Sequence, residues 1–146
     1  MTKTAFYLLS FTWGLLTTLA GCAAAGLHLL CGHKPKKWGY CWYFEYGERH
    51  WGGMSLGIFF FKDKSLSTHI KNHEHGHAIQ NCWLGPLMPF VIAIPSFSRY
   101  WYREYQMRVR HVQPRTHYDA VWFEGQATRL GTELLRQISE KKNDDK

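Results

Sequence analysis

The stretch from Asn72 to Gly85 reads NHEHGHAIQNCWLG and places three histidines and a glutamate within the five positions 73–77. Ser65 or Ser67 can cap a helix that begins shortly before this stretch, because a serine side chain accepts a hydrogen bond from a free amide of the first turn. The glycine–proline pair at its other end stops a helix. The stretch therefore predicts a helix with a cluster of metal-binding side chain types.

The histidine spacing matches H-E-x-x-H. Residues i and i+4 lie above one another on a helix, so His73 and His77 can both bind one ion while Glu74 lies beside it. His75 is rotated by about 200° from His73 and points away from that face. His69 lies one turn earlier, but it would be about 12 Å from His77 along the helix, too far for both to bind the same ion. Another element must supply the third ligand.

Glutamates downstream are the candidates for this third ligand. Glu124 lies between Phe123 and Gly125 in a stretch apolar enough to pack inside the protein, and a buried carboxylate needs a partner. We expect Glu124 to be the ligand, with Glu104 and Glu133 as alternatives. Two histidines and a carboxylate are a ligand set typical of catalytic zinc, so the expected cofactor is Zn²⁺.

Bulk composition sets limits on the remaining chain. The 146 residues have room for one modest domain, the net charge is +7, and 16% of the residues are aromatic. Aromatic residues gather where one side is apolar and the other is wet, which indicates a membrane interface. The four cysteines form no CxxC pair and are expected to stay reduced.

The N-terminal part contains an uncharged run of 27 residues from Ala5 to Cys31. About 20 apolar residues suffice to cross a bilayer, so residues 1–32 are predicted to be a transmembrane anchor. Lysines are more numerous after the run than before it, which predicts that the rest of the protein faces the cytoplasm from the cell membrane. The segment LAGC at 19–22 resembles a lipobox, but the apolar residues that follow it favour an uncleaved helix.

The remaining elements follow from composition and periodicity. Trp38 to Tyr46 and Met54 to Phe61 predict a β-hairpin or part of a small sheet. Trp83 to Phe97 is uncharged but broken by three prolines and too short to span a bilayer, so it is expected to be a re-entrant or interfacial segment or a buried core segment. Arg99 to His111 suits a headgroup-level belt better than base stacking, and no nucleic acid partner is expected. Tyr118 to Gln137 predicts a last helix.

His73, Glu74 and His77, followed by Glu124 on a later helix, resemble the gluzincin arrangement of thermolysin-type zinc metallopeptidases. Residues 70–131 also resemble a group of small bacterial membrane proteins that share HExGHxxQ, a Gly-Pro turn, an IPS segment and an E-x-x-A helix. The resemblance implies zinc at His73, His77 and Glu124, and a general base at Glu74.

The sequence departs from the gluzincin pattern at one place. Many gluzincins carry an acidic residue four positions after the glutamate ligand, where it orients a zinc-binding histidine, and here that position is Thr128. A hydroxyl is a weaker orienting group than a carboxylate. The group that would stabilise an oxyanion is not singled out by the sequence; the candidates are His111, His117, Tyr118 and Arg129.

These expectations combine into an α+β fold. A transmembrane helix (1–32) precedes a small zincin-like domain (33–140) that contains the β-hairpin, the HExxH helix, the apolar segment 83–97 and the C-terminal helix; a polar tail (141–146) follows. The strand MSLGIFFF is either a core strand or the strand that pairs with an extended substrate. The expected function is that of a membrane-anchored zinc metallopeptidase acting on a peptide or protein; the alternative is a non-hydrolytic membrane protein with a structural or vestigial zinc site.

Overall fold

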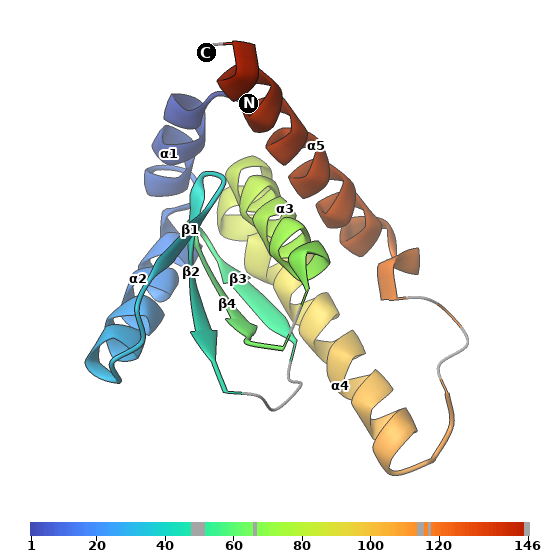
Figure 1. Cartoon of the computed structure of the whole chain (residues 1–146). Helices are drawn as coiled ribbons and strands as arrows, with labels where there is room; N and C mark the ends of the chain where they lie inside the picture. The colour runs from blue at the N-terminus through green and yellow to red at the C-terminus, as the bar shows by residue number, and fades with distance from the viewer. Residues whose placement is uncertain (48–51, 66, 114–115, 117, 145–146) are drawn as a thin grey trace.

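A computed structural model describes residues 1–47, 52–65, 67–113, 116 and 118–144. Within these residues the protein is a mixed α+β fold with a four-stranded sheet and five α-helices (Figure 1). The elements are α1 (Lys3–Phe11), α2 (Leu15–Leu30), β1 (Lys36–Trp38), β2 (Cys41–Tyr46), β3 (Gly53–Leu56), β4 (Phe59–Asp63), α3 (Thr68–Leu84), η1 (Gly85–Leu87), η2 (Pro89–Ala93), α4 (Ile94–Arg108), η3 (Tyr118–Ala120) and α5 (Trp122–Asp144).

The N-terminal apolar run forms two helices instead of the one straight helix that was predicted. Helices α1 and α2 meet at 90°. The chain turns at Gly14, which packs so closely on α3 that a Cβ there would lie 2.4 Å from Asn81 Nδ2. Among the described residues, none of the helices taken singly is long and apolar enough to cross a membrane; two bent helix pairs, of which α1 with α2 is one, meet that test only together.

Each of the two predicted strands is also divided. Gly39 and Gly57 adopt positive φ angles of 58° and 63°, and at these glycines the chain turns back on itself. The resulting sheet has the order β1-β2-β4-β3, in which both outer pairs are antiparallel and the central pair, β2 with β4, is parallel. The two predicted segments are therefore part of a small sheet, but they do not pair as the antiparallel hairpin that was one of the expectations.

The sheet is covered on both faces (Figure 1). Tyr43 and Phe60 stack at 5.1 Å on one face, in a cluster with residues of α1 and α3. Phe44 and Phe61 pack on the other face against Ala25 of α2. Because successive side chains of a strand point to opposite faces, the parallel register of β2 and β4 places aromatic pairs in both layers.

The helix predicted from the histidine stretch is α3. It begins after Ser67 and ends at Gly85, whose φ of +53° few residues other than glycine adopt. Every residue from His73 to Cys82 is buried, because the sheet and α1 lie on one side of α3 and α5 lies on the other (Figure 1). The helix that carries the histidines is thus the centre of the fold.

The proline-containing segment after α3 is helical throughout. A 3₁₀ turn (η1) leads into a short π-helix (η2) and then into α4, so the chain bends by 116° but remains hydrogen-bonded. Two of the prolines, Pro89 and Pro95, fall at the first positions of η2 and α4, where the missing amide hydrogen costs nothing. The predicted arginine and aromatic belt forms most of α4.

The last helix is longer than predicted. The turn η3 precedes α5, which continues past Gln137 to Asp144 and so includes most of the segment expected to be a polar tail. Arg136 pairs with Glu133 at 2.8 Å and with Glu140 at 2.5 Å on its exposed side. Such i,i+3 and i,i+4 pairs support helical continuation into solvent.

Helices α3 and α5 approach each other closely at two glycines. A Cβ on Gly76 would lie 1.8 Å from the carbonyl oxygen of Ala127, and a Cβ on Gly131 would lie 1.8 Å from that of Asn72. No side chain fits between the helices at these two points. The contact brings the start of α5 against the histidine-bearing face of α3.

We predict that Gly131→Ala destabilises the protein by about 2 kcal/mol or more, because the added methyl group must push α5 away from α3. Chemical denaturation in the presence of a chelator measures this effect without any contribution from metal. The matched control is Gly26→Ala on α2, where a Cβ meets nothing within 4 Å and helix propensity favours alanine. Equal stability of the two variants would contradict the close contact.

Candidate metal centre

Three side-chain atoms from α3 and α5 converge on one point. His73 Nε2 and His77 Nε2 lie 3.1 Å apart. Glu124 Oε2 lies 3.1 Å from the first of these nitrogens and 3.2 Å from the second. In the described part of the chain this is the one group of three or more potential ligands that could hold a metal ion. The ligand set predicted from the sequence is therefore brought together in space.

Thr128 holds the imidazole of His73. Its Oγ1 lies 2.8 Å from His73 Nδ1 and donates its own hydrogen to Asp119 Oδ2 at 3.3 Å. Since the hydroxyl hydrogen is directed to Asp119, the threonine oxygen accepts the hydrogen of His73 Nδ1. Position 128 has no carboxylate of its own. The carboxylate of Asp119, from η3, acts on His73 through the hydroxyl of Thr128.

Gln80 holds the imidazole of His77. Its side-chain nitrogen donates to the Phe123 carbonyl at 2.8 Å and to Gln126 Oε1 at 3.0 Å. These two bonds turn the amide oxygen toward His77 Nδ1, at 2.7 Å. An amide oxygen can only accept, so Nδ1 of His77 carries the hydrogen.

Because Thr128 and Gln80 accept the hydrogens on Nδ1 of the two neutral imidazoles, the Nε2 atoms of His73 and His77 carry lone pairs. Two imidazole lone pairs and a carboxylate oxygen then face one another without a hydrogen between them, an arrangement that a cation stabilises. Nitrogen and oxygen ligands of tetrahedral zinc, bound at about 2.0–2.2 Å, lie about 3.3–3.5 Å from one another. The observed separations of 3.1–3.2 Å are slightly shorter than these values, so the three residues could hold a metal ion.

The electrostatics of the cluster agree with this geometry. Burial alone would raise the pKa of Glu124, but the facing imidazoles of His73 and His77, which donate hydrogen bonds to this carboxylate only when they are protonated, outweigh burial and hold that pKa well below its usual range. Burial alone would lower the pKa of His73, but the carboxylates of Glu124, Glu74 and Asp119 outweigh it and raise that pKa. The site therefore favours an ionised carboxylate and positive charge beside it.

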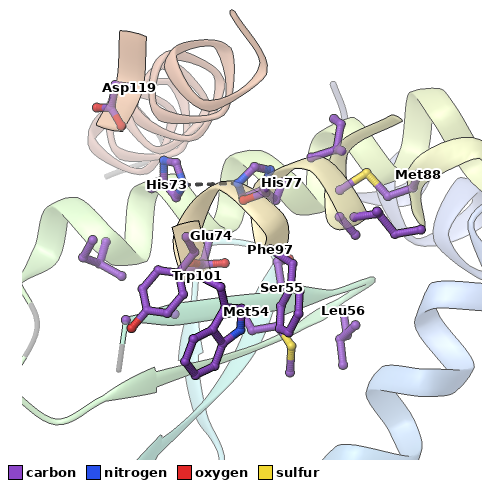
Figure 2. A pocket seen from close by; sticks show the side chains of 18 of the residues that line it. Met54, Ser55, Leu56, His73, Glu74, His77, Met88, Phe97, Trp101 and Asp119 are labelled. Atoms are coloured by element: carbon purple, nitrogen blue, oxygen red, sulfur yellow. Dashed lines mark hydrogen bonds between the residues drawn. The ribbon is translucent and has the colours of Figure 1, made fainter. Parts of the chain in front are cut away.

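Glu74 lies beside the cluster and faces a cavity of about 640 Å³. The cavity is bordered by β3, α3 and α4, and His73, Glu74 and His77 line it together. Figure 2 shows His73 and His77 directed toward each other, with Glu74 on the side of β3 and Asp119 on the opposite side. Gly53 leaves room for Glu74, because a Cβ there would lie 2.4 Å from Glu74 Oε1. Burial raises the pKa of Glu74.

His75 has a structural role. Its ring is buried, stacks on Phe6 at a centroid distance of 6.1 Å, and accepts the backbone N–H of Tyr40 at Nε2, 3.1 Å away. Burial lowers the pKa of His75 to about 4. His75 therefore points away from the metal ligands, as its position on the helix predicts, and contacts α1 and the β1–β2 turn.

Several other candidates lie outside the cluster. His69 is exposed, 3.7 Å from Asp119. Glu104 pairs with Arg108, and Glu133 with Arg136, so neither alternative ligand reaches the site. Of the four candidates for an oxyanion donor, His111 and Arg129 are exposed and do not line the cavity, Tyr118 begins η3, and His117 lies outside the described residues.

Sequence reasoning missed two residues of the site, Gln80 and Asp119. Gln80 follows His77 by three positions on the same helix, a spacing at which side chains meet, so the sequence could have predicted this contact. Asp119 has no such signal, because only the packing of η3 against α5 brings it to Thr128.

Comparisons with known proteins return no match: no family model matches the chain, and no curated protein or solved structure is significantly similar to it.

Thr128→Val is expected to weaken zinc binding by about 10–100-fold, because His73 loses the acceptor that orients its ring while all three ligands remain. Competition with a chromophoric chelator measures the affinity. Thr132→Val is the matched control, one turn later on α5 and exposed. An unchanged affinity in Thr128→Val would show that the hydroxyl does not position His73.

Stability without metal is expected to fall as the pH decreases from about 6.5 toward 4. Unfolded His75 takes up a proton near pH 6.5, whereas buried His75 does so only near 4. The unfolded state therefore binds more protons across this window, which costs up to about 3 kcal/mol. Denaturation of wild type and His75→Gln at pH 7 and pH 5, both with chelator, isolates this contribution. The same loss in both proteins would exclude His75 as its source.

Proposed function

We propose that His73, His77 and Glu124 bind Zn²⁺ and that the protein hydrolyses peptide bonds in the manner of a gluzincin metallopeptidase. The observation that carries the proposal is that Glu74 borders one cavity together with His73 and His77, while Glu124 Oε2 lies within 3.2 Å of both histidine nitrogens. Zinc, when bound by such a ligand set, supplies a Lewis acid that polarises a carbonyl group and makes water a nucleophile at neutral pH.

Glu74 is the general base in this proposal. It lies next to His73 in sequence, lines the cavity with both histidines, and is not a member of the ligand cluster. A carboxylate so placed can take a proton from an attacking water and pass it to the leaving amine. Thr128 and Gln80 support the reaction indirectly by holding the two imidazole rings in place.

The position of strand β3 favours a polypeptide as the substrate. It is an edge strand of the sheet in the described part of the chain, and all its residues border the cavity. An extended peptide can add to such an edge through backbone hydrogen bonds. The cavity wall also contains Met54, Leu56, Met88 and Ile92, which suit apolar substrate side chains.

A second candidate function is a structural zinc site. The ligands come from two helices that touch through glycines, and Glu124 is fully buried. An ion there would tie α5 to α3 without any reaction. This alternative predicts the same ligands but no role for Glu74.

Glu74→Gln separates the two candidates. If the protein is a peptidase, this variant should bind zinc stoichiometrically and lose peptide cleavage by about 100-fold or more, since the base is gone while the ligands remain. Cleavage of a broad peptide library, followed by mass spectrometry, measures activity, and elemental analysis measures zinc.

Two controls accompany this experiment. Glu124→Ala should lose zinc under either function, so retained zinc in that variant would refute the ligand assignment. Glu104→Gln removes a partly buried carboxylate that is paired with Arg108 outside the cluster and should change neither zinc content nor cleavage. A zinc-loaded wild type that cleaves no peptide would favour the structural site.

A further inference from the structure

Helix α2 has its large apolar side chains on the outside. The residues that face the protein are small or polar, and those that face outward are leucines. The buried residues are Thr17, Thr18, Gly21 and Ala25. The exposed leucines are Leu15, Leu16, Leu19, Leu27, Leu29 and Leu30. Small residues inside and leucines outside are typical of helices that contact lipid, and they reverse the pattern of a helix that faces water.

The inward polar residues of α2 are hydrogen-bonded. Thr18 Oγ1 donates to the Ser10 carbonyl at 2.9 Å, and Thr17 Oγ1 bonds to the Asn81 side chain. These contacts join α2 to α1 and α3 without a large apolar interface. Polar contacts between helices are a normal means of association where the surroundings are apolar.

The segment after α3 repeats this pattern. Helix α4 has no buried residue, and exposed aromatic and aliphatic side chains run along the segment. They are Leu87, Phe90, Ile94, Phe97, Trp101, Tyr102 and Tyr105, of which Ile94, Phe97 and Trp101 also line the cavity beside Glu74. Large exposed apolar surfaces mark sites of contact with a membrane or a partner.

The bend between α1 and α2 and the bend between α3 and α4 lie against each other. Trp13, in the first bend, donates its Nε1 hydrogen to the Trp83 carbonyl at 3.3 Å. A Cβ on Gly85, in the second bend, would lie 2.4 Å from Trp13 Nε1. Helix α2 also contacts η1. The exposed apolar surfaces of the two pairs therefore meet at the bends.

Charge is distributed at the ends of these segments. Residues 4–33 and 83–98 contain no Asp, Glu, Lys or Arg. Lys3 is the first residue of α1, Lys34, Lys36 and Lys37 follow α2, and α4 carries Arg99, Arg103 and Arg108. Basic residues and aromatic rings suit the headgroup layer of an anionic bilayer, whereas the uncharged bends suit its hydrocarbon.

We propose that the two bends enter one leaflet of a bilayer as a re-entrant wedge, with the basic ends of α1, α2 and α4 in the headgroups of that same leaflet. A lipid occupant is favoured over a second copy of the chain, because α2 exposes apolar residues on every side except one stripe. A protein partner would cover a single face. In this arrangement neither α1 nor α2 crosses the membrane.

Single cysteines test the wedge in the full chain. The parent variant carries Cys22→Ser and Cys31→Ser and keeps the two buried cysteines. Thr4→Cys marks the start of α1, Leu87→Cys marks the second bend, and restored Cys31 marks the end of α2; all three positions are exposed. Thr132→Cys on α5 is the control outside the surface.

Each protein is diluted from detergent into preformed vesicles of phosphatidylcholine and phosphatidylglycerol and labelled from outside with an impermeant maleimide. The wedge predicts that positions 4, 31 and 132 react, and that position 87 reacts about tenfold more slowly or less, because the hydrocarbon core excludes water. A fluorophore attached at position 87 should also be quenched by acyl-chain spin labels.

Each other outcome overturns the proposal. If position 4 or 31 reacts only after the vesicles are lysed, the first helix pair spans the bilayer. If position 87 is protected but not quenched by spin-labelled lipid, another protein copy covers it. If position 87 reacts as fast as position 132, or the protein does not sediment with vesicles, the bends do not enter lipid.

Discussion

The contact between α3 and α5 at Gly76 and Gly131 is the constraint on which the site depends. The two helices touch backbone to backbone there, with no room for a methyl group on either glycine. This approach places Glu124, in the first turn of α5, within 3.2 Å of both histidine nitrogens on α3. A wider spacing would leave a fully buried carboxylate without its two histidine partners, at a large cost in desolvation.

Hydrogen bonds at Nδ1 determine that each histidine ring faces Glu124 with its Nε2 atom. Thr128, backed by Asp119, receives the hydrogen of one imidazole, and Gln80 receives that of the other. Both Nε2 atoms consequently face Glu124 as lone-pair donors. The sequence departs from the gluzincin pattern at position 128, but Asp119 of η3 supplies a carboxylate that acts on His73 through the hydroxyl of Thr128.

The protein is organised around a polar helix inside and apolar helices outside. Helix α3, with three histidines and a glutamate, is buried between the sheet and α5, whereas α2 and α4 expose leucines and aromatic rings. A buried polar helix is stable only when its side chains are paired, as those of His73, His77 and Gln80 are. The exposed apolar helices are the part of the molecule for which a lipid environment is proposed.

Local sequence determined the helix that carries the histidines, its stop at Gly85, the choice of His73 and His77 over His75, and the candidacy of Glu124. Those features follow from helical periodicity and from the cost of burying a lone carboxylate. Tertiary structure alone decided the break at Gly14, the parallel pairing of β2 with β4, and the arrival of Asp119 behind Thr128. Each of these depends on how separate elements pack against one another, as Gly14 does against Asn81 and η3 against α5, and residue spacing along one helix or strand carries no information about such contacts.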